Sequence, residues 1–522
     1  MKYTLSRIFC VAFCCMLYTI KIYAVAPIPG SGLVEPKRPR APFEIVFHDS
    51  KTNVQRVAPK QSAPQINMAP RGLLMLVEFS DVTFDPLNTQ QAFDSLANGE
   101  NYTYNGATGS CQAYFKAQSN GQYVPEFDVV GPLKLPESTA YYGANDAYGN
   151  DQYVVDLVID ACSAADQSGV DFSQYDNDNN GIVDFVYIIY AGYAESEGGG
   201  LIPSAIWPHN WDLISALYYG NSNKEDYYAN SDTDYKLPSF DGKLVNAYAC
   251  SNELRKENDA RAGIGTICHE FSHVLGLPDY YLTVTDKATN PNHRHTPGNW
   301  SLMGHGNYLN AGNTPPNFSA YEKYFLGWLT PEVLNKNQAL TIPADGATYF
   351  MLTRNETHVA EGAYRTDTVY YIENRQQEGW DKYLPGHGLM LTYIQYSASK
   401  WAENTVNNKA KSMGVDLIEA DGKAPDYNQG KETDLFPAGA KAYLKIEGHA
   451  IEEIEEIDGV IKFKYKGGVI DPETAVENTK LNLEIVGIYN ILGQKQTTTN
   501  IEDLPTGAYI VVTPLQSYKI IR

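Results

Sequence analysis

Two histidines placed four residues apart constrain this chain more than any other feature of its sequence. They belong to the run HEFSHVLGLPD at 269–279, in which a glutamate directly follows the first histidine. Residues i and i+4 lie on one face of an α-helix, so a helix here would point His269 and His273 the same way. Two imidazoles that converge in this way can bind one zinc ion, at Zn–N distances of about 2.0–2.1 Å.

The residues after the second histidine supply a third candidate ligand. Gly276 stands where helices commonly end in the left-handed region, which would let the chain turn and bring Asp279 back to the metal. Two nitrogens and one carboxylate oxygen leave the fourth tetrahedral position to water, as in catalytic zinc sites. Two alternatives stay open: a later acidic residue could be the third ligand, or Asp279 could support the ligands without binding the metal.

Glu270 is the candidate general base. Zinc lowers the pKa of its bound water from 15.7 toward about 7, and a nearby carboxylate can take that proton and pass it to the leaving amine of a peptide bond. His, Glu, His, Gly and Asp at this spacing arise by chance in a chain this long with a probability of roughly 10⁻⁴. The run therefore indicates a catalytic zinc site rather than a polar turn on an ordinary helix.

The segment WSLMGHGNY at 300–308 offers further candidates. In metzincin-like peptidases a methionine in a tight turn forms an apolar floor under the metal, and Met303 is placed for this, although a core methionine has the same composition. Tyr308 is a candidate hydrogen-bond donor to the oxyanion of the reaction. The loop histidines, expected mostly to face solvent or substrate, are His293, His295 and His305.

The run DNDNNGIVD at 176–184 is similar to the start of a calcium-binding loop. Its twelfth position is Tyr187 rather than Glu, and a strand follows, so it is not an EF-hand. We expect a calcium loop completed by a carboxylate elsewhere, such as Asp171; the alternative is an Asx-rich turn held by its own side chains. The candidate oxygen ligands are those of Asp176, Asp178, Asn180, the Ile182 carbonyl and Asp184.

Charge and the N-terminal segment restrict the partners and the compartment. The chain has 62 acidic and 40 basic residues, a formal net charge of −22, which argues against nucleic acid and anionic membranes as partners. Residues 1–26 have basic residues before a 13-residue apolar run, which is typical of a signal peptide and short for a membrane span. We expect an exported protein with no transmembrane segment in its mature chain.

Four cysteines remain beyond residue 26: Cys111, Cys162, Cys250 and Cys268. In an exported protein they permit two disulfides. A bond between Cys250 and Cys268 would tether the helix that carries the motif, while buried free thiols are an equally good interpretation.

The pattern of apolar residues predicts four parts after the signal peptide. Residues 27–70 are Pro-rich and indicate a linker or short propeptide. Strands at 73–79 and 184–193, with helices at 151–165, at the motif and at 317–328, predict an α/β catalytic domain over 71–330. Alternating short strands predict a β-sandwich or barrel-like module over 331–468, and a small β-rich segment occupies 471–522.

Several runs that occur in order make residues from about 71 to 440 similar to the M6 peptidases, the immune-inhibitor-A-like secreted metalloproteases. Besides the motif they include GLLMLVEFSD (72–81), IWPHNW (206–211), WSLMG (300–304) and AYEKYFLGW (320–328). The resemblance implies a metzincin-like fold, one catalytic zinc and endopeptidase activity on proteins or peptides. Carried over residue by residue, the zinc ligands fall on His269, His273 and Asp279, with Glu270 as the base.

The last residues resemble a different family. The pieces YNILGQ, LPTGAYIVV and a terminal KIIR within 486–522 are similar to the C-terminal sorting domain that the type IX secretion machinery reads. This implies passage across the outer membrane, removal of the tail, and release or attachment at the cell surface. A small β module that merely ends the chain is the alternative.

Two functions therefore follow from the sequence. The first is a secreted zinc endopeptidase. The second is a surface adhesin or glycan-binding protein on an inactive peptidase scaffold, in which the β-rich module binds. The intact Glu270 favours the first, since loss of the base commonly accompanies loss of activity.

Overall fold

The computed structural model separates the chain into two compact units, Met1–Lys466 and Gly467–Arg522. Residues 1–26, the predicted signal peptide, lie outside the described residues. The described ranges are 46–48, 55–57, 70–146, 149–197, 204–227, 235–283, 297–344, 346–353, 368–409, 413–423, 430–437, 443–446 and 449–466, followed by 487–490, 495–496, 498, 505, 508–512 and 517–521.

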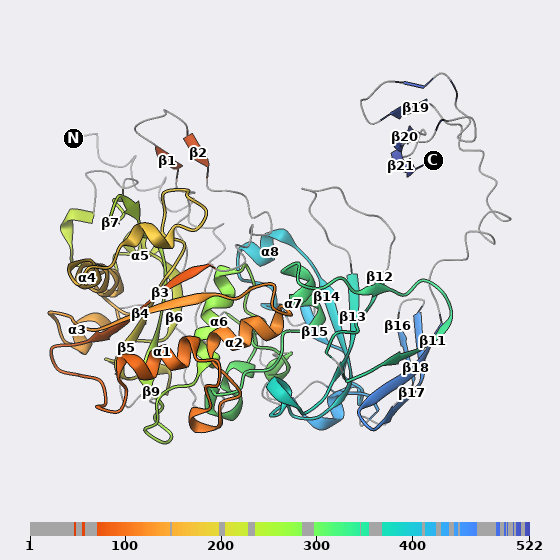
Figure 1. Ribbon diagram of the computed structural model, residues 1–522, viewed down its shortest axis with the longest axis horizontal. Helices are drawn as coiled ribbons and strands as arrows, with labels where there is room; N and C mark the ends of the chain where they lie inside the picture. Colours follow the sequence, from red (N-terminus) through yellow and green to blue (C-terminus); the bar gives the residue numbers. More distant parts are fainter. Residues whose placement is uncertain are drawn as a thin grey trace, which may run out of the picture. The chain divides into compact units, whose positions relative to one another are not determined.

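A five-stranded sheet, in the order β4-β3-β5-β9-β6, organises the first part of the larger unit (Figure 1). Four neighbouring strands are parallel, and β6 pairs antiparallel with β9 at one edge. The strands are β3 (Arg71–Glu78), β4 (Glu126–Lys134), β5 (Val186–Tyr193), β6 (His209–Asp212) and β9 (Ala247–Leu254). The strands predicted at 73–79 and 184–193 are confirmed as β3 and β5.

Helices cover both faces of this sheet because its central strands are apolar on both sides. In β3, Leu74 and Leu76 pack into one core, whereas Leu73, Met75 and Val77 pack into the other. Helices α1 (Gln90–Asn98), α2 (Cys111–Gln118) and α6 (Ile264–Val274) contribute to the first core. Helices α3 (Thr139–Gly143), α4 (Val154–Gln167) and α5 (Leu213–Tyr218) contribute to the second, and α4 confirms the helix predicted at 151–165.

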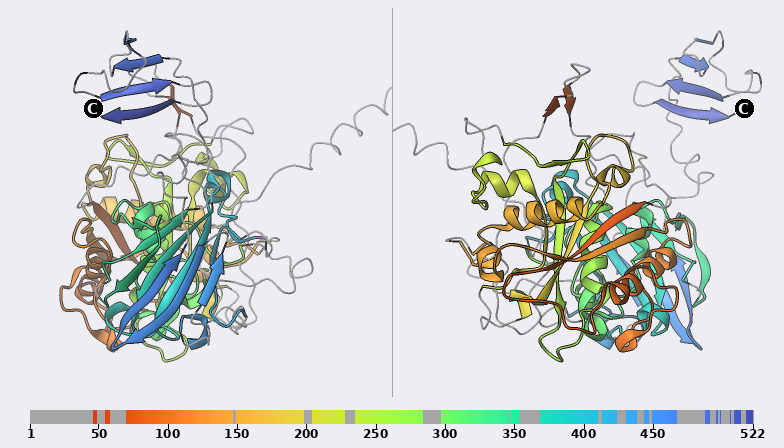
Figure 2. Two further views of the ribbon diagram at one scale, coloured as in Figure 1. Left: turned by 90° about the vertical axis from the view of Figure 1, so that its right-hand side faces the viewer. Right: turned by 60° about the vertical axis from the view of Figure 1, so that its left-hand side comes forward.

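Two antiparallel-rich sheets form the second part of the larger unit (Figure 2), which we call the β-rich module. One sheet contains β10 (Glu332–Val333), β12 (Phe350–Thr353), β13 (Thr368–Arg375), β14 (Gly388–Gln395) and β15 (Val415–Leu417). The other contains β11 (Gln338–Ile342), β18 (Val460–Lys466), β17 (His449–Ile457) and β16 (Tyr443–Ile446). Leu352 and Ile372 of the first sheet share one core with Ile461 and Phe463 of the second, so the sheets pack against each other.

The β-rich module also packs against the helices of the first part. Tyr321 of α7 (Ala320–Phe325), the helix predicted at 317–328, lies against Tyr371 of β13 and Trp401 of α8 (Ala398–Ala402), with ring centroids 5.7 and 6.2 Å apart. Beside this contact Arg375 is buried and forms two hydrogen bonds to Asp381, at 2.8 and 2.6 Å. The two parts therefore share a continuous hydrophobic core, and this ion pair of the β-rich module also bonds to the backbone of Asn317, just before α7.

The smaller elements complete the description. β1 (Val46–His48) and β2 (Gln55–Val57) pair antiparallel within the predicted linker, and β7 (Ser239–Phe240) pairs with β8 (Lys243–Leu244). In the C-terminal unit, β19 (Gly487–Asn490), β20 (Ala508–Val512) and β21 (Ser517–Ile521) form an antiparallel sheet. Within the described residues, no helix has the length and apolarity needed to cross a membrane.

Of the two interpretations of the cysteines, the structure has buried free thiols: all four cysteines beyond residue 26 are free, and Cys250 and Cys268 are not joined. The reason is topological. Cys250 of β9 belongs to the core on one face of the sheet, whereas Cys268 of α6 belongs to the core on the other face. The Cys250 sulfur instead lies 3.4 Å from Nδ1 of His209.

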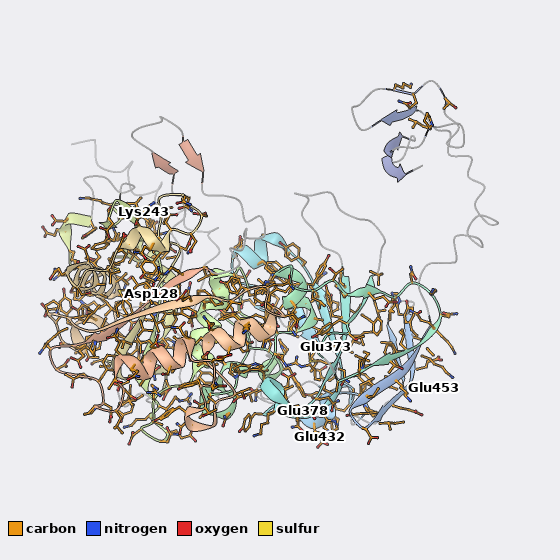
Figure 3. All side chains as sticks on the ribbon, viewed as in Figure 1. Asp128, Lys243, Glu373, Glu378, Glu432 and Glu453 are labelled. Atoms are coloured by element: carbon orange, nitrogen blue, oxygen red, sulfur yellow. The ribbon has the colours of Figure 1, made fainter. Side chains whose placement is uncertain are left out.

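Glu373, labelled in Figure 3, generates a prediction about stability. Burial raises the pKa of this carboxyl from 4.5 to about 7, although Arg375 and Lys323 act in the opposite direction. Between these pH values the folded protein keeps a proton that the unfolded chain has released, so stability should fall as the pH rises from about 4.5 to 7. In Glu373→Gln this decrease should be smaller, as measured by unfolding temperature against pH. Glu378→Gln, at an exposed neighbour, is the control, and equal pH dependence in all three proteins would contradict the prediction.

Candidate metal centre

The motif helix α6 packs directly against η6 (Gly306–Gly312), a segment that begins and ends with glycine. A Cβ atom on Gly265 would stand 1.9 Å from the Asn307 carbonyl oxygen, and one on Gly263 would stand 2.2 Å from that of Gly312. Only glycine permits this approach. At the other end Gly276 has φ +91°, which confirms the predicted left-handed helix end, and the chain then reverses toward the histidines.

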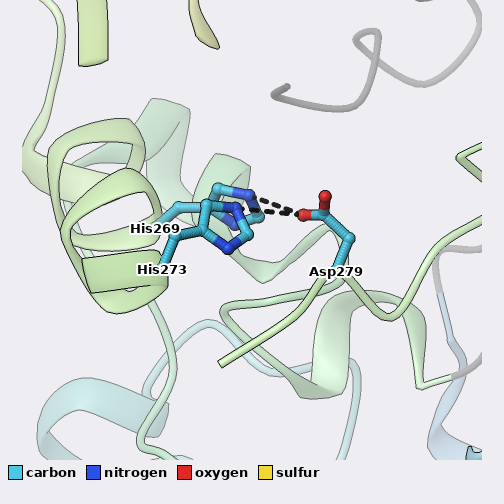
Figure 4. Close-up of side chains that lie close together, drawn as sticks. All are labelled: His269, His273 and Asp279. Atoms are coloured by element: carbon cyan, nitrogen blue, oxygen red, sulfur yellow. Dashed lines mark ion pairs between the residues drawn. The ribbon is translucent and has the colours of Figure 1, made fainter. Parts of the chain in front are cut away.

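Three potential ligand atoms converge where the chain returns (Figure 4). Oδ1 of Asp279 lies 3.1 Å from Nε2 of His269 and 3.3 Å from Nε2 of His273. The side chains of all three residues are almost completely removed from solvent. Among the His, Cys, Asp and Glu side chains of the described ranges, these three form the group whose ligand atoms come within metal-binding reach of one another.

The arrangement fits a tetrahedral ion. Ligands about 2.0–2.1 Å from a tetrahedral zinc would lie about 3.3 Å from one another, close to the observed separations. Each imidazole also has a carbonyl oxygen at its other nitrogen: that of Leu302 lies 2.9 Å from Nδ1 of His269, and that of Leu277 lies 2.7 Å from Nδ1 of His273. Such contacts place the proton on Nδ1 and leave Nε2 available as a metal ligand.

The electrostatics of the site point the same way. Burial lowers the pKa of His269, but its contacts with Asp279 and the charge of Glu270 raise it to about 9. Burial raises the pKa of Asp279, but the two imidazoles lower it well below its ordinary value. The charges around the two imidazoles therefore favour a cation at this position.

Glu270 lies beside the three candidate ligands, and Tyr308 lies in η6, the segment that packs against α6. Glu270 is fully buried on α6, and its Oε2 is 4.0 Å from Nε2 of His273. Tyr308 is half-buried in η6, beneath the Arg255 guanidinium at 5.6 Å from its ring centroid. Burial raises the pKa of Tyr308, with the nearby carboxylates of Glu197 and Glu270 acting in the same direction against Arg255, so its phenol stays protonated at neutral pH.

The turn that contains Met303 is tied directly to the site. Gly304 N–H donates to the Ser301 carbonyl, Met303 N–H donates to the Ser301 hydroxyl, and that hydroxyl donates to Oε1 of Glu322 on α7. The Met303 carbonyl accepts from the amide of Tyr280, the residue after Asp279. Met303 is fully buried in the core shared with α6, and its role as the floor of a metal site stays a prediction.

Asn404 contacts the centre and was not indicated by the sequence pattern. It lies after α8 in the β-rich module, is fully buried, and accepts a hydrogen bond from the Asp279 amide at 2.7 Å. Its Nδ2 donates to Oδ2 of the same aspartate. No local motif links residues 125 positions apart, and the left-handed conformation of Asn404 (φ +50°) is visible only in coordinates.

Of the three loop histidines, only His305 lies among the described residues. His305 does not face solvent: it is buried, its ring lies 5.9 Å from that of Tyr281, and burial lowers its pKa to about 4. His293 and His295 lie outside the described residues.

The 176–184 loop has the arrangement of the Asx-rich turn that was the alternative to a calcium loop. Asp176 accepts from the amides of Asn180 and Gly181 at 2.9 Å each, and Asp178 also accepts from Asn180. Lys243, labelled in Figure 3, lies 2.6 Å from Asp176 and supplies a positive charge there. Asp184 accepts from the amide of Asn177, Ile182 donates its amide to Asn180, and Asp171 is exposed and bonded to Ser173. Calcium binding by these residues stays a prediction.

Known proteins share the part of the chain that carries this centre. Residues 71–329 match the family described as "Immune inhibitor A peptidase M6, catalytic domain". This range contains every candidate ligand and Glu270, whereas Asn404 lies beyond its end. The match supports the peptidase resemblance that was drawn from the sequence.

Two curated relatives agree with this assignment. The chain is 33% identical over 232 residues to "Immune inhibitor A" of Bacillus thuringiensis subsp. alesti, covering 41% of this chain and 31% of the relative. It is 26% identical over 306 residues to "Pre-pro-metalloprotease PrtV" of Vibrio cholerae, covering 53% of this chain and 31% of the relative. The chain thus spans about a third of the length of each relative. The name of the second relative and the description of the matched family support a metallopeptidase.

The geometry predicts the effect of removing one ligand. Asp279→Asn keeps the size of the side chain but removes the charge beside the two imidazoles. We expect zinc affinity to fall by more than the roughly 10–100-fold that loss of an outer-shell partner costs. Competition with a coloured chelator measures this. Asp178→Asn, which removes an exposed carboxylate from the 176–184 loop, should leave zinc affinity unchanged. Equal zinc affinity in the Asp279 variant and the unaltered protein would exclude Asp279 as a ligand.

Proposed function

We propose that this protein is a zinc-dependent endopeptidase that acts on proteins or peptides outside the cell that makes it. The observation that carries the proposal is the convergence of two imidazole nitrogens and one carboxylate oxygen, at 3.1 and 3.3 Å, beside a fully buried glutamate. The matched peptidase family supports the same reaction class. An adhesin on an inactive scaffold would not need Glu270, whose carboxylate is retained next to the ligands.

His269, His273 and Asp279 would hold the ion. Zinc bound there would supply a Lewis acid that acidifies a water molecule and polarises the substrate carbonyl. Glu270 would accept the proton of the attacking water and deliver it to the amine that leaves when the peptide bond breaks. The carbonyl contacts of Leu302 and Leu277 would keep both imidazoles in the tautomer that this role requires.

Export forms a second component of the proposal. Residues 1–26 would act as a signal peptide, and the C-terminal unit would act as the sorting domain read by the type IX secretion machinery. Its support is the sequence resemblance within 486–522 together with the separation of Gly467–Arg522 as a compact unit. A calcium ion in the 176–184 loop would stabilise the exported form by cross-linking that turn.

Replacing the proposed base tests the reaction directly. Glu270→Ala should keep zinc, because Glu270 is not a ligand, and should lose activity on fluorogenic casein by several orders of magnitude; general acid–base groups contribute roughly 10²–10⁴-fold. Zinc content and turnover are measured on the same sample. A chelator should abolish the activity of the unaltered protein, and added zinc should restore it. Turnover in Glu270→Ala equal to that of the unaltered protein would refute the assigned base.

Tyr308 is proposed as a donor to the oxyanion, since η6 packs against α6 and the Glu270 carboxylate is near enough to raise the pKa of the phenol. Tyr308→Phe removes only the hydroxyl, and loss of one such donor typically lowers kcat by about 10²–10³-fold. We expect kcat to fall while KM and zinc content change little. A change confined to KM would instead assign Tyr308 to substrate binding.

A further inference from the structure

Asn404 makes a two-point contact with Asp279 that no other described residue makes. The Asp279 amide donates to Oδ1 of Asn404 at 2.7 Å, and Nδ2 of Asn404 donates to Oδ2 of Asp279. The other carboxylate oxygen, Oδ1, is the one that lies 3.1 and 3.3 Å from the two imidazoles. The side-chain amide group of Asn404 thus bonds both to the backbone N–H of Asp279 and to Oδ2, the carboxylate oxygen that does not face the imidazoles.

The contact with Asn404 fixes the rotation of the Asp279 carboxylate, which the surrounding loop does not fix. Asp279 lies beyond the end of α6 in a segment without regular secondary structure, so helix hydrogen bonds do not orient it. The neighbouring bond, from the Tyr280 amide to the Met303 carbonyl, positions the chain but leaves the carboxylate free to rotate. A donor on Oδ2 and an acceptor on the amide together select the rotation in which Oδ1 faces the histidines.

Asn404 is itself held rigidly. Its backbone carbonyl accepts a hydrogen bond from the Thr283 hydroxyl at 2.9 Å, and its backbone N–H donates to the Trp401 carbonyl at 3.3 Å. Its φ of +50° lies in the left-handed region, which asparagine tolerates better than most residues. Trp401 is buried in the core that the β-rich module shares with α6 and α7. The amide group is therefore anchored to the β-rich module as a whole.

We propose that Asn404 is a positioning residue for the metal ligand Asp279, so that the β-rich module completes the metal centre. The inference rests on the proposed function in taking Asp279 as a ligand. It goes beyond that function by assigning a metal-site role to a residue outside the 71–329 peptidase match. Loss of an outer-shell partner of this kind typically weakens metal affinity by about 10–100-fold.

The same loop supplies a matched control. Asn408 joins the same two segments, accepting from the Thr283 amide at 2.9 Å and donating to the Thr283 hydroxyl at 2.9 Å. Thr283 lies four residues after Asp279, and the side chain of Asn408 bonds to Thr283 rather than to the Asp279 carboxylate. A variant at 408 therefore weakens the bridge between the segments without removing a partner of the proposed ligand.

The experiment compares full-length Asn404→Gly, Asn408→Ala and unaltered protein. Glycine removes the amide group without strain at φ +50°, and Asn404→Ala is a second variant that also lacks it. Zinc dissociation constants come from chelator competition. Unfolding temperatures of the metal-free proteins measure how much the bonds between the two segments stabilise the fold. Asn404→Gly should bind zinc about 10–100-fold more weakly. Asn408→Ala should keep the zinc affinity of the unaltered protein, even if its metal-free unfolding temperature falls as much as that of Asn404→Gly.

Each other outcome has a distinct meaning. Unaltered zinc affinity in Asn404→Gly, alongside the loss in Asp279→Asn, overturns the positioning role and leaves the proposed function intact. No zinc binding by the unaltered protein overturns the proposed function itself. Equal losses of affinity in the 404 and 408 variants, or failure of both 404 variants to fold, would make Asn404 a structural link and overturn its positioning role.

Discussion

The metal centre depends on one reversal of the chain, which returns Asp279 to two histidines on the preceding helix. Its cost is the burial of a carboxylate and two imidazoles, which is unfavourable unless opposite charges or a cation compensate. The positive φ of Gly276 permits the reversal. The returning chain is then held to the tight turn around Met303 by a hydrogen bond from the Tyr280 amide to the Met303 carbonyl. Burial in turn strengthens the attraction between the carboxylate and whatever cation lies between the imidazoles. Most of the contacts described around α6 hold these three groups together with their side chains removed from bulk solvent.

Local parts of this arrangement could be predicted from the sequence because they depend on short spacings. The i, i+4 relation placed His269 and His273 on one face, and a glycine three residues later indicated where the helix ends. The strands β3 and β5 were predicted because continuous apolar runs are typical of buried parallel strands. These predictions needed no knowledge of which distant segments meet.

What the sequence could not predict depends on long-range packing or on local irregularity. The choice between a Cys250–Cys268 bond and free thiols stayed open because sequence does not reveal that the two residues lie on opposite faces of one sheet. Strand β17 has Ile451 and Ile454 both buried although they are three residues apart, since the register shifts between Glu452 and Glu455. Buried residues three apart do not match the period of two that indicates a strand, because the bulge adds a residue. Lys243 at Asp176 is another contact that only the fold brings together.

The division between catalytic domain and β-rich module is therefore weaker in the structure than in the sequence pattern. Removing everything after residue 329 would expose Tyr321 on α7, which now packs against Tyr371 and Trp401. It would also remove Asn404 from Asp279, leaving a buried backbone amide and a carboxylate oxygen without these hydrogen bonds. An unpaired buried polar group costs about 1–3 kcal/mol, so the loss would fall on the ligand itself as well as on the surrounding core. The module that follows the peptidase match is part of the structure that shapes the candidate metal centre.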